Sequence, residues 1–229
     1  MTRTVVLCGS LGTTAAMWEA QRDALSSFDV VTIEHPGHGS TPVYEVATVG
    51  DLARHVLDLV GETAFSFVGL SLGGAVGLRL ALDHPDRLER LVLACTSARF
   101  GEPAQWHGRA ETVRREGTEA IADAVLERWF TPSFADVARY REMLLSTERE
   151  GYARCCEALA VWDVRAELAA VATPTLVLAG SDDPSTPAAD LAALADRIPR
   201  AKFAAIDAAR HLPNVERPTE FNRLLEDHL

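Results

Sequence analysis

The sequence predicts an α/β protein in which a mostly parallel, doubly wound sheet carries a helical insertion. Short apolar runs alternate with helical patterns through residues 1–95 and again through 171–229. Residues 96–170, between them, contain helical segments and no strand-like run. A single Gly-x-Ser-x-Gly motif, Gly69–Gly73, separates one apolar run from the helical pattern that follows it. Alternation of short strands with helices implies βαβ crossovers, which build parallel sheets covered on both faces.

The first predicted elements begin close to the N-terminus. Thr4–Cys8 is an apolar run that predicts a strand, and no small-residue cleavage site follows it, so it does not resemble a signal peptide. Thr14–Ser26 has its large side chains near helical spacing. Val30–Ile33 predicts a second strand, and a loop rich in Gly, Pro and His follows at residues 34–40. Val49–Leu59 predicts a helix because its apolar residues share one face.

The remaining core elements surround the Gly-x-Ser-x-Gly motif and follow the insertion. Phe65–Val68 is a mostly apolar run that predicts a strand, and Leu72–Leu82 is a helical pattern rich in small residues. The other predicted strands are Arg90–Ala94, Thr175–Ala179 and Lys202–Ile206, and the other predicted helices are Ala188–Arg197 and Pro218–His228. We therefore expect a sheet of about six strands.

The insertion is predicted to be a helical lid. Its helical segments are Thr118–Arg128, Phe134–Leu145 and Gly151–Ala160. It leaves the sheet after one strand and returns at the next, so it lies at the carboxyl end of a strand. Ligands of open parallel sheets bind at that end. We therefore interpret residues 96–170 as a lid over a binding site, and residues 1–95 with 171–229 as the core.

The composition is that of an acidic chain with a large core. It has 229 residues, 48% hydrophobic content and a formal net charge of −11, which fits one domain with an insertion. The negative charge argues against nucleic acid or an anionic membrane surface as a partner. No apolar run reaches the roughly 18 residues that a membrane span needs. The cysteines Cys8, Cys95, Cys155 and Cys156 lack metal-site spacing and suit a reduced, cytoplasmic protein.

Ser71, at the centre of the Gly-rich motif, is a candidate nucleophile. A strand, a sharp turn flanked by glycines and a helix expose the serine hydroxyl at the top of a sheet. A serine nucleophile needs a general base, and the base needs an orienting acid. His211 follows the last predicted strand and is the candidate base, because the other histidine beyond the lid, His228, lies at the chain end. The order Ser, acid, His is typical of such an elbow.

The acid and the oxyanion donors are expected on two further loops. Asp182 and Asp183 both follow the strand at Thr175–Ala179, and the residues alone leave the choice between them open. The oxyanion of an acyl-transfer intermediate needs preorganised backbone N–H donors. Leu72, directly after the nucleophile, is expected to supply one, and Leu11, in the loop after the first strand, the other.

Two other sequence features are weak evidence for a metal site or a dinucleotide-binding site. His35 and His38 lie in the loop at residues 34–40, but no Asp, Glu or Cys cluster accompanies them, so we expect them to pack the loop rather than bind a metal. Gly9–Gly12 lacks the G-x-G-x-x-G spacing of a dinucleotide-binding turn.

Together these residues resemble the α/β-hydrolase family over nearly the whole chain, from Val5 to Leu229. In that family the acid commonly lies in a Gly-x-x-Asp-x-x-Thr-Pro motif, which the segment Gly180–Pro187 matches with Asp183 at the acid position. The resemblance therefore places Asp183 ahead of Asp182. Family members usually begin with an antiparallel edge pair, whereas this chain begins almost on its first core strand, so we expect a sheet shorter by that pair.

A narrower resemblance is to 3-oxoadipate enol-lactonases. The segments that carry it are Ser10–Thr14 with Met17-Trp18, Gly69–Gly74, Ala120–Pro132 and Gly151–Ala158. The lid segments are the specific ones, because lids differ most between hydrolase subfamilies. Trp162 departs from the pattern, since relatives tend to have a smaller or different residue there, and we expect it to narrow the pocket.

The resemblance implies hydrolysis of 3-oxoadipate enol-lactone, a late step of aromatic catabolism in the β-ketoadipate pathway, without a metal or redox cofactor. The substrate would be a small anionic lactone, whose carboxylate needs an arginine in a dry pocket because the chain itself is acidic. Arg128 is the candidate, and it and its neighbour Trp129 are expected to bind substrate. The alternatives are another carboxylesterase, thioesterase or carbon–carbon hydrolase, a cofactor-free haloperoxidase, or a non-catalytic ligand-binding protein on the same scaffold.

Overall fold

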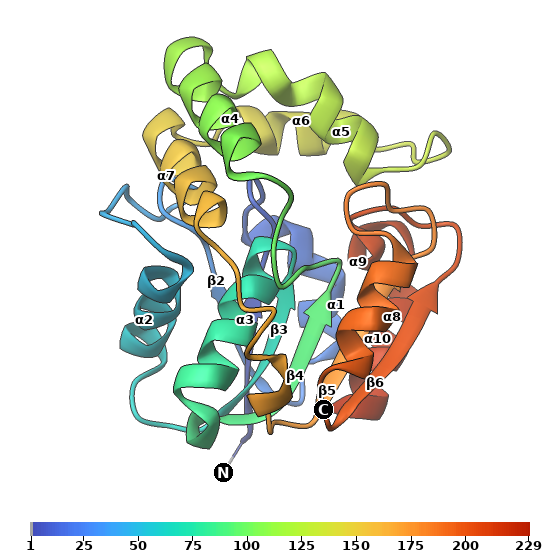
Figure 1. Cartoon of the computed structure of the whole chain (residues 1–229). Coiled ribbons are helices and arrows are strands. Elements are labelled where there is room, and N and C mark those ends of the chain that lie inside the picture. The colour runs from blue at the N-terminus through green and yellow to red at the C-terminus, as the bar shows by residue number, and fades with distance from the viewer. Residues whose placement is uncertain (1) are drawn as a thin grey trace.

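A six-stranded, fully parallel sheet forms the centre of the computed structural model, which describes residues 2–229 (Figure 1). The strands are β1 (Thr4–Cys8), β2 (Asp29–Ile33), β3 (Phe65–Leu70), β4 (Leu88–Ala94), β5 (Thr175–Gly180) and β6 (Ala201–Ile206). Their order is β2-β1-β3-β4-β5-β6. The direction of building therefore reverses between β1 and β3, and the carboxyl end of such a switch point is where open α/β sheets bind ligands. The predicted strands and their parallel arrangement are confirmed.

Burial along the strands follows from their places in the sheet. Every residue of β3 and β5 is buried, as expected of central strands covered on both faces. The edge strands are less buried: β2 has one exposed and three half-buried residues, and β6 has three exposed residues. The largest side chains that are fully buried include Trp18, Phe65, Phe67 and Phe221, so the core extends from the sheet to the helices on both faces.

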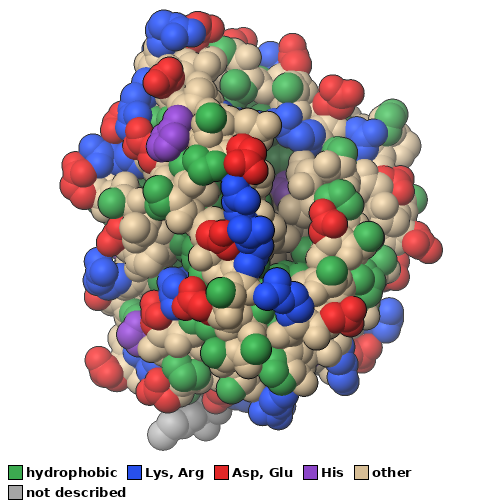
Figure 2. All heavy atoms as spheres, viewed as in Figure 1, with side chains coloured by type: hydrophobic (Ala, Val, Ile, Leu, Met, Phe, Trp, Pro, Cys, Tyr) green, Lys and Arg blue, Asp and Glu red, His purple; other side chains and the backbone are tan. Residues whose placement is uncertain are grey.

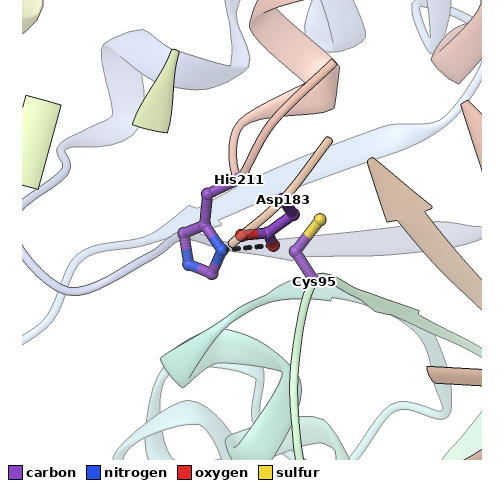
Figure 3. Close-up of side chains that lie close together, drawn as sticks. All are labelled: Cys95, Asp183 and His211. Carbon is purple, nitrogen blue, oxygen red and sulfur yellow. Dashed lines mark hydrogen bonds and ion pairs between the residues drawn. The ribbon is translucent and has the colours of Figure 1, made fainter. Parts of the chain in front are cut away.

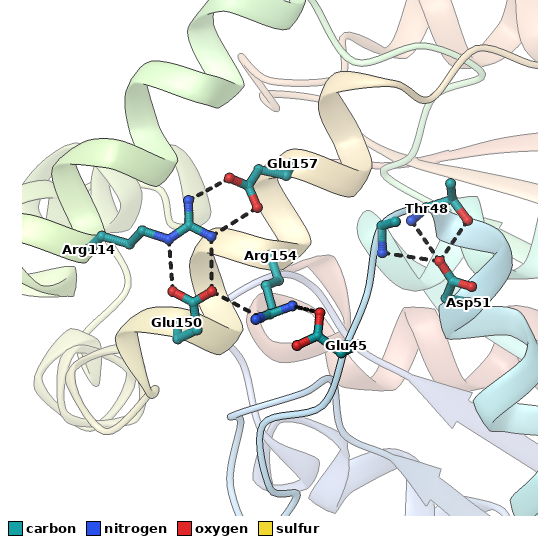
Figure 4. Close-up of polar contacts among 8 residues, drawn as sticks. Glu45, Thr48, Asp51, Arg114, Glu150, Arg154 and Glu157 are labelled. Atoms are coloured by element: carbon teal, nitrogen blue, oxygen red, sulfur yellow. Dashed lines mark hydrogen bonds and ion pairs between the residues drawn. The ribbon is translucent and has the colours of Figure 1, made fainter.

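Six helices accompany the sheet. They are α1 (Glu19–Ala24), α2 (Val49–Val60), α3 (Leu72–Asp83), α8 (Ala188–Asp196), α9 (Pro213–Glu216) and α10 (Pro218–His228). Helix α2 packs against α3, and α1 packs against α10. The predicted helix at Thr14–Ser26 is shorter and begins as a 3₁₀ turn, Ala15–Trp18. Helix α2 begins with a capping box in which Thr48 and Asp51 exchange hydrogen bonds (Figure 4).

Four helices lie across the carboxyl ends of the strands, between β4 and β5 in the chain (Figure 1). They are α4 (Pro103–Glu116), α5 (Ala122–Trp129), α6 (Val137–Leu145) and α7 (Arg149–Ala160). The last three correspond to predicted helices, and α4 was not predicted. Its sequence is mostly polar and buries only Ala110 and Val113, so it lacks the apolar stripe on which the prediction depends. Pro103, favoured in the first turn of a helix, is the signal that marks its start.

Ion pairs connect these helices to one another and to the sheet region. Arg114 of α4 forms hydrogen-bonded ion pairs with Glu150 and Glu157 of α7 (Figure 4). Arg154 of α7 pairs with Glu45, in the loop before α2. No helix within residues 2–229 is long and apolar enough to cross a membrane.

Candidate active site

Ser71 lies at a sharp turn between β3 and α3. Its backbone has φ +57° and ψ −112°, a conformation that L-residues rarely adopt and that costs energy. Two hydrogen bonds hold it there: the Ser71 N–H donates to the Ala94 carbonyl at 2.8 Å, and the Thr96 hydroxyl donates to the Ser71 carbonyl at 2.7 Å. The end of β4 thus fixes the turn, and the serine is held in the strained geometry expected of a nucleophile elbow.

The glycines of the motif are required by close approach of backbones. A Cβ on Gly69 would collide with the Gly73 carbonyl, and a Cβ on Gly73 would collide with the Cys8 carbonyl of β1. The Gly73 N–H donates to the Gly9 carbonyl at 3.1 Å. These contacts pack the start of α3 directly against the end of β1, which brings the loop after β1 beside Ser71.

His211 and Asp183 form a buried hydrogen-bonded pair. The His211 Nδ1 donates to the Asp183 Oδ2 at 2.7 Å (Figure 3). Thr186 Oγ1 donates to the same oxygen at 2.6 Å, and the Ser185 N–H donates to Oδ1 at 2.8 Å. Burial by itself would raise the pKa of the Asp183 carboxyl, but His211 and these two donors outweigh it and lower that pKa below its ordinary value. Asp183 is therefore a stable anion that orients the imidazole.

Asp182, the competing candidate, points elsewhere. Its side chain is exposed and accepts a hydrogen bond from Ser181.

Hydrogen bonds on both sides of His211 fix the loop that carries it. The Arg210 N–H donates to the Glu216 carboxylate, and the Leu212 N–H donates to the Trp129 carbonyl at the end of α5.

Cys95 completes a cluster with this pair. Its Sγ and the nearest ligand atoms of Asp183 and His211 all lie within 4.8 Å of one another (Figure 3), and Cys95 also has a positive φ of +44°. Burial, followed by the charge of Asp183, raises the pKa of the Cys95 thiol well above its ordinary value. The thiol therefore stays protonated. Because the carboxylate oxygens already accept three hydrogen bonds, the cluster favours an orienting acid over a metal ligand set.

The two predicted oxyanion donors are the backbone N–H groups of Leu72 and Leu11. Leu72 is the first residue of α3, and Leu11 lies in the loop after β1. Neither N–H donates to another group within residues 2–229. Unpaired N–H groups at a helix N-terminus and in an adjacent loop can accept a developing oxyanion. Leu11 lines the same cavity as Ser71, and Leu72 directly follows Ser71 in the chain.

A cavity of about 430 Å³ joins these groups. Ser71, His211 and Leu11 line its floor, and residues of α4, α5 and α7 line its other walls. The hydrogen bonds within residues 2–229 do not include one between Ser71 and His211; catalytic hydrogen bonds of ligand-free sites often form only when substrate is bound. The arrangement can place a small acyl compound between the serine and the helices.

Two arginines line this cavity. They are Arg128 of α5, which was predicted, and Arg109 of α4, which was not. Arg109 lies over the ring of Trp106 with its guanidinium carbon 5.1 Å from the ring centroid. Neither arginine forms an ion pair with an acidic side chain in the described part of the chain. Burial, followed by the charge of Arg109, lowers the pKa of Arg128.

Two cations that face a cavity without an acidic partner favour an anionic ligand. Figure 2 shows basic side chains gathered beside a hollow near the centre of the face that it depicts. A second cleft, of about 300 Å³, borders the first, and its charged lining residues are Arg99, Arg165, Arg197 and Asp190. Arg99 and Arg165 are paired with acidic side chains.

Of the two tryptophans Trp129 and Trp162, only Trp129 is among the residues that line the cavity. Trp129, which was predicted to bind substrate, is buried and lines the cavity. The prediction that Trp162 narrows the pocket is wrong, because Trp162 is not among the cavity residues and its Nε1 donates to the Ser97 carbonyl at 2.9 Å. Its indole instead anchors the chain segment that leads out of β4.

The fold and site define the class of protein. A parallel sheet with this strand order, a serine elbow after β3 and a His–Asp pair after the last strands are the features of an α/β-hydrolase. The model of the alpha/beta hydrolase family matches residues 5–224, and the chain belongs to that family.

Its relatives include lactonases. The chain is 37% identical over 232 residues to 3-oxoadipate enol-lactonase 2 of Acinetobacter baylyi, covering 97% of this chain and 86% of that protein. The crystal structure of the enol-lactonase from Burkholderia xenovorans LB400 matches with a TM-score of 0.94 and 37% identity, covering 99% of this chain and 91% of that one.

The family is broader than lactonases. A relative from Agrobacterium fabrum, named "Putative carbamate hydrolase RutD", is 32% identical over 97% of this chain and 92% of its own length. The relatives and structural neighbours together establish that the protein is a hydrolase of ester bonds.

Proposed function

We propose that the protein opens 3-oxoadipate enol-lactone to 3-oxoadipate in the β-ketoadipate pathway, by a serine mechanism. The observation that carries the proposal is one cavity in which Ser71 and His211 face Arg109 and Arg128. The substrate has a reactive ester carbonyl at one end and a carboxylate at the other. The names of the relatives support the same substrate.

The proposed chemistry assigns a role to each group around the serine. His211 takes the proton of Ser71 as Ser71 Oγ attacks the lactone carbonyl, and Asp183 stabilises the resulting imidazolium. The N–H groups of Leu11 and Leu72 bind the oxyanion. Collapse of the intermediate breaks the ring C–O bond and expels an enolate, which remains tethered to the acyl-enzyme.

The tethered enolate must be protonated before the acyl-enzyme is hydrolysed. It could attack the acyl carbon again and close the ring. Transfer of the proton from the His211 imidazolium to the enolate gives the ketone, removes this internal nucleophile and returns His211 to its neutral form. Water, activated by His211, then attacks the acyl-enzyme and releases 3-oxoadipate with Ser71 restored. The sequence consumes one water and needs no redox change.

Arg109 and Arg128 are assigned to the substrate carboxylate, and Trp129 to the wall beside it. A guanidinium forms two parallel hydrogen bonds with a carboxylate, and the interaction is stronger where water is excluded. Residues 96–170 act as a lid in this proposal, because they supply both arginines while the core supplies the triad. Four free, buried cysteines support a reducing, cytoplasmic location.

A substrate panel tests this proposal. The purified protein should remove 3-oxoadipate enol-lactone, followed by loss of its ultraviolet absorbance, with a much higher kcat/KM than for 4-nitrophenyl acetate or N-alkyl carbamates. Cleavage of the nitrophenyl ester without lactone loss would assign a different ester substrate. Preferential cleavage of the carbamate would place the protein with its carbamate-hydrolase relatives, and saturable lactone binding without turnover would make it a binding protein.

A further inference from the structure

His35 and His38 contact the loop that carries Leu11. The imidazole of His38 accepts a hydrogen bond at Nε2 from the Gly12 N–H at 2.9 Å. The imidazole of His35 donates from Nε2 to the Gly9 carbonyl, also at 2.9 Å. Gly9 and Gly12 flank Ser10 and Leu11 in the sequence. The two histidines therefore hold both ends of the segment that contains Leu11, whose N–H is the proposed oxyanion donor.

The tautomer of each ring follows from its partners. His38 Nδ1 lies 2.9 Å from the Pro36 carbonyl, which can only accept, so the proton is on Nδ1 and Nε2 is free to accept from Gly12. His35 must carry its proton on Nε2, since the Gly9 carbonyl is also an acceptor. Protonation of His38 at Nε2 would remove the acceptor of the Gly12 N–H.

Both rings are neutral at neutral pH. They are almost completely buried, at 2% and 0% exposure. Burial lowers the pKa of His35 to about 4 and that of His38 to about 3. The charged form is thus excluded under the conditions in which a hydrolase of this kind works, and the hydrogen bonds described above persist.

The loop needs such support because its own backbone is permissive. Gly12 has φ +85°, a region that glycine enters without steric cost and leaves as easily. An oxyanion donor is effective only when it lies 2.7–3.1 Å from the developing charge, so a loose loop would lose much of the benefit. Its other fixed points are the hydrogen bonds from Gly73 to Gly9 and from Thr13 to Ser10, and neither of them reaches Gly12.

His38 also connects this loop to the helices above the sheet. Its ring stacks on Tyr152 of α7 at a centroid distance of 6.4 Å and an interplanar angle of 15°. The N–H of Glu148, at the start of α7, donates to the Gly37 carbonyl at 2.8 Å. A Cβ on Gly151 would collide with the Pro36 carbonyl. The histidine loop is therefore packed between α7 and the Leu11 loop.

We propose that His35 and His38 are positioning residues, an imidazole clamp that holds the Leu11 N–H in place for the oxyanion. The proposal rests on the proposed serine mechanism but not on the identity of the lactone. It gives a role in the reaction to two histidines that lie outside the triad and do not line the cavity.

The test compares His38→Phe with His38→Gln. Phenylalanine keeps the ring stack on Tyr152 and removes the acceptor, whereas the glutamine Oε1 can reach the position of the lost Nε2. Turnover of 4-nitrophenyl acetate gives kcat and KM, and a trifluoromethyl ketone, which adds to Ser71 as a tetrahedral oxyanion, gives an inhibition constant. His55→Leu, a histidine of α2 outside the cavity, is the matched control.

We expect His38→Phe to lower kcat about 10- to 100-fold, somewhat less than deletion of an oxyanion donor, with KM within about threefold. The ketone should bind more weakly by a similar factor, because it depends on the same N–H. His38→Gln should recover most of both losses, and His55→Leu should match the wild type.

Several outcomes would overturn the clamp while leaving the serine mechanism intact. They are a folded His38→Phe protein with wild-type kcat, a loss of kcat without loss of ketone affinity, or a glutamine variant as impaired as the phenylalanine variant. Should His38→Phe fail to fold, ¹⁵N NMR of the wild type decides, since an Nε2–H tautomer for His38 contradicts the clamp. A wild type that neither cleaves the ester nor binds the ketone refutes the proposed function itself.

Discussion

The two walls of the cavity are built in different ways. The wall formed by the ends of β1, β3 and β5 is fixed by buried hydrogen bonds and by backbones too close for any side chain, as at Gly69 and Gly73. The wall formed by α4, α5 and α7 packs through side chains: buried ones such as Val113 and Tyr152, and partly exposed ion pairs such as Arg114 with Glu150 and Glu157. Bond making needs the tighter positioning, and recognition of a carboxylate tolerates the looser one.

Apart from loss of the nucleophile itself, the largest effect is expected at the sheet wall, from Asp183. Asp183→Asn should lower kcat by about 10⁴-fold, because the amide cannot hold His211 in the tautomer that accepts the serine proton. Asp182→Asn is the matched control and should change kcat by less than about twofold, because its side chain is exposed. Steady-state kinetics on the lactone or on 4-nitrophenyl acetate measures both, and the opposite ranking would transfer the role of the acid to Asp182.

The next effect is expected at the helical wall, from the arginines. Arg109→Ala and Arg128→Ala should each raise KM for the enol-lactone about 10- to 100-fold, since a charge-assisted hydrogen bond contributes about 1.5–3 kcal/mol. The kcat should change little, and KM for the neutral nitrophenyl ester should not change. Arg115→Ala, at an exposed position of α4 outside the cavity, is the control for both variants. An unchanged lactone KM would remove the carboxylate role from that arginine.

The buried histidines should make the free energy of unfolding of the protein depend on pH. An unfolded histidine has a pKa near 6.5, whereas those of His35 and His38 are lowered to about 4 and about 3. Between these values the unfolded chain binds more protons, so the free energy of unfolding falls as pH falls from about 6.5 toward 4.

The variant His38→Gln isolates the part of this pH dependence that comes from His38. Between pH 7.5 and 5.5 the wild type should lose about 1 kcal/mol more stability than the variant, because the variant lacks one buried, unprotonated imidazole. Urea unfolding at the two pH values measures the difference. Equal losses in the two proteins would mean that His38 titrates normally in the folded state.

The smallest effect is expected from the ion pairs of the helical wall. Arg114→Met should lower the free energy of unfolding by about 1 kcal/mol and the Tm by about 2–4 °C, since partly exposed pairs contribute little. The kcat should stay within about twofold, because Arg114 does not line the cavity. Thermal unfolding beside Arg115→Met provides the comparison. A large loss of kcat would show that this wall is positioned more strictly than we infer.

The sheet wall was also the part that the sequence predicted best. Continuous apolar runs determine the strands, and the Gly-x-Ser-x-Gly motif and the motif around Asp183 depend on local backbone geometry, so all of them can be read along the chain. Helix α4 and with it Arg109 were missed because a polar helix over a cavity has no apolar stripe. The contacts of His38 with Gly12 and of Trp162 with Ser97 depend on tertiary structure and leave no local signal.

Ser71→Ala tests whether Ser71 is the group that attacks the substrate. We predict that the variant loses at least about a thousandfold in kcat for 3-oxoadipate enol-lactone, as in other serine hydrolases from which the nucleophile is removed. Its urea unfolding midpoint should not fall, because alanine removes only a hydroxyl. A folded Ser71→Ala protein that still opens the lactone at the wild-type rate would contradict the account.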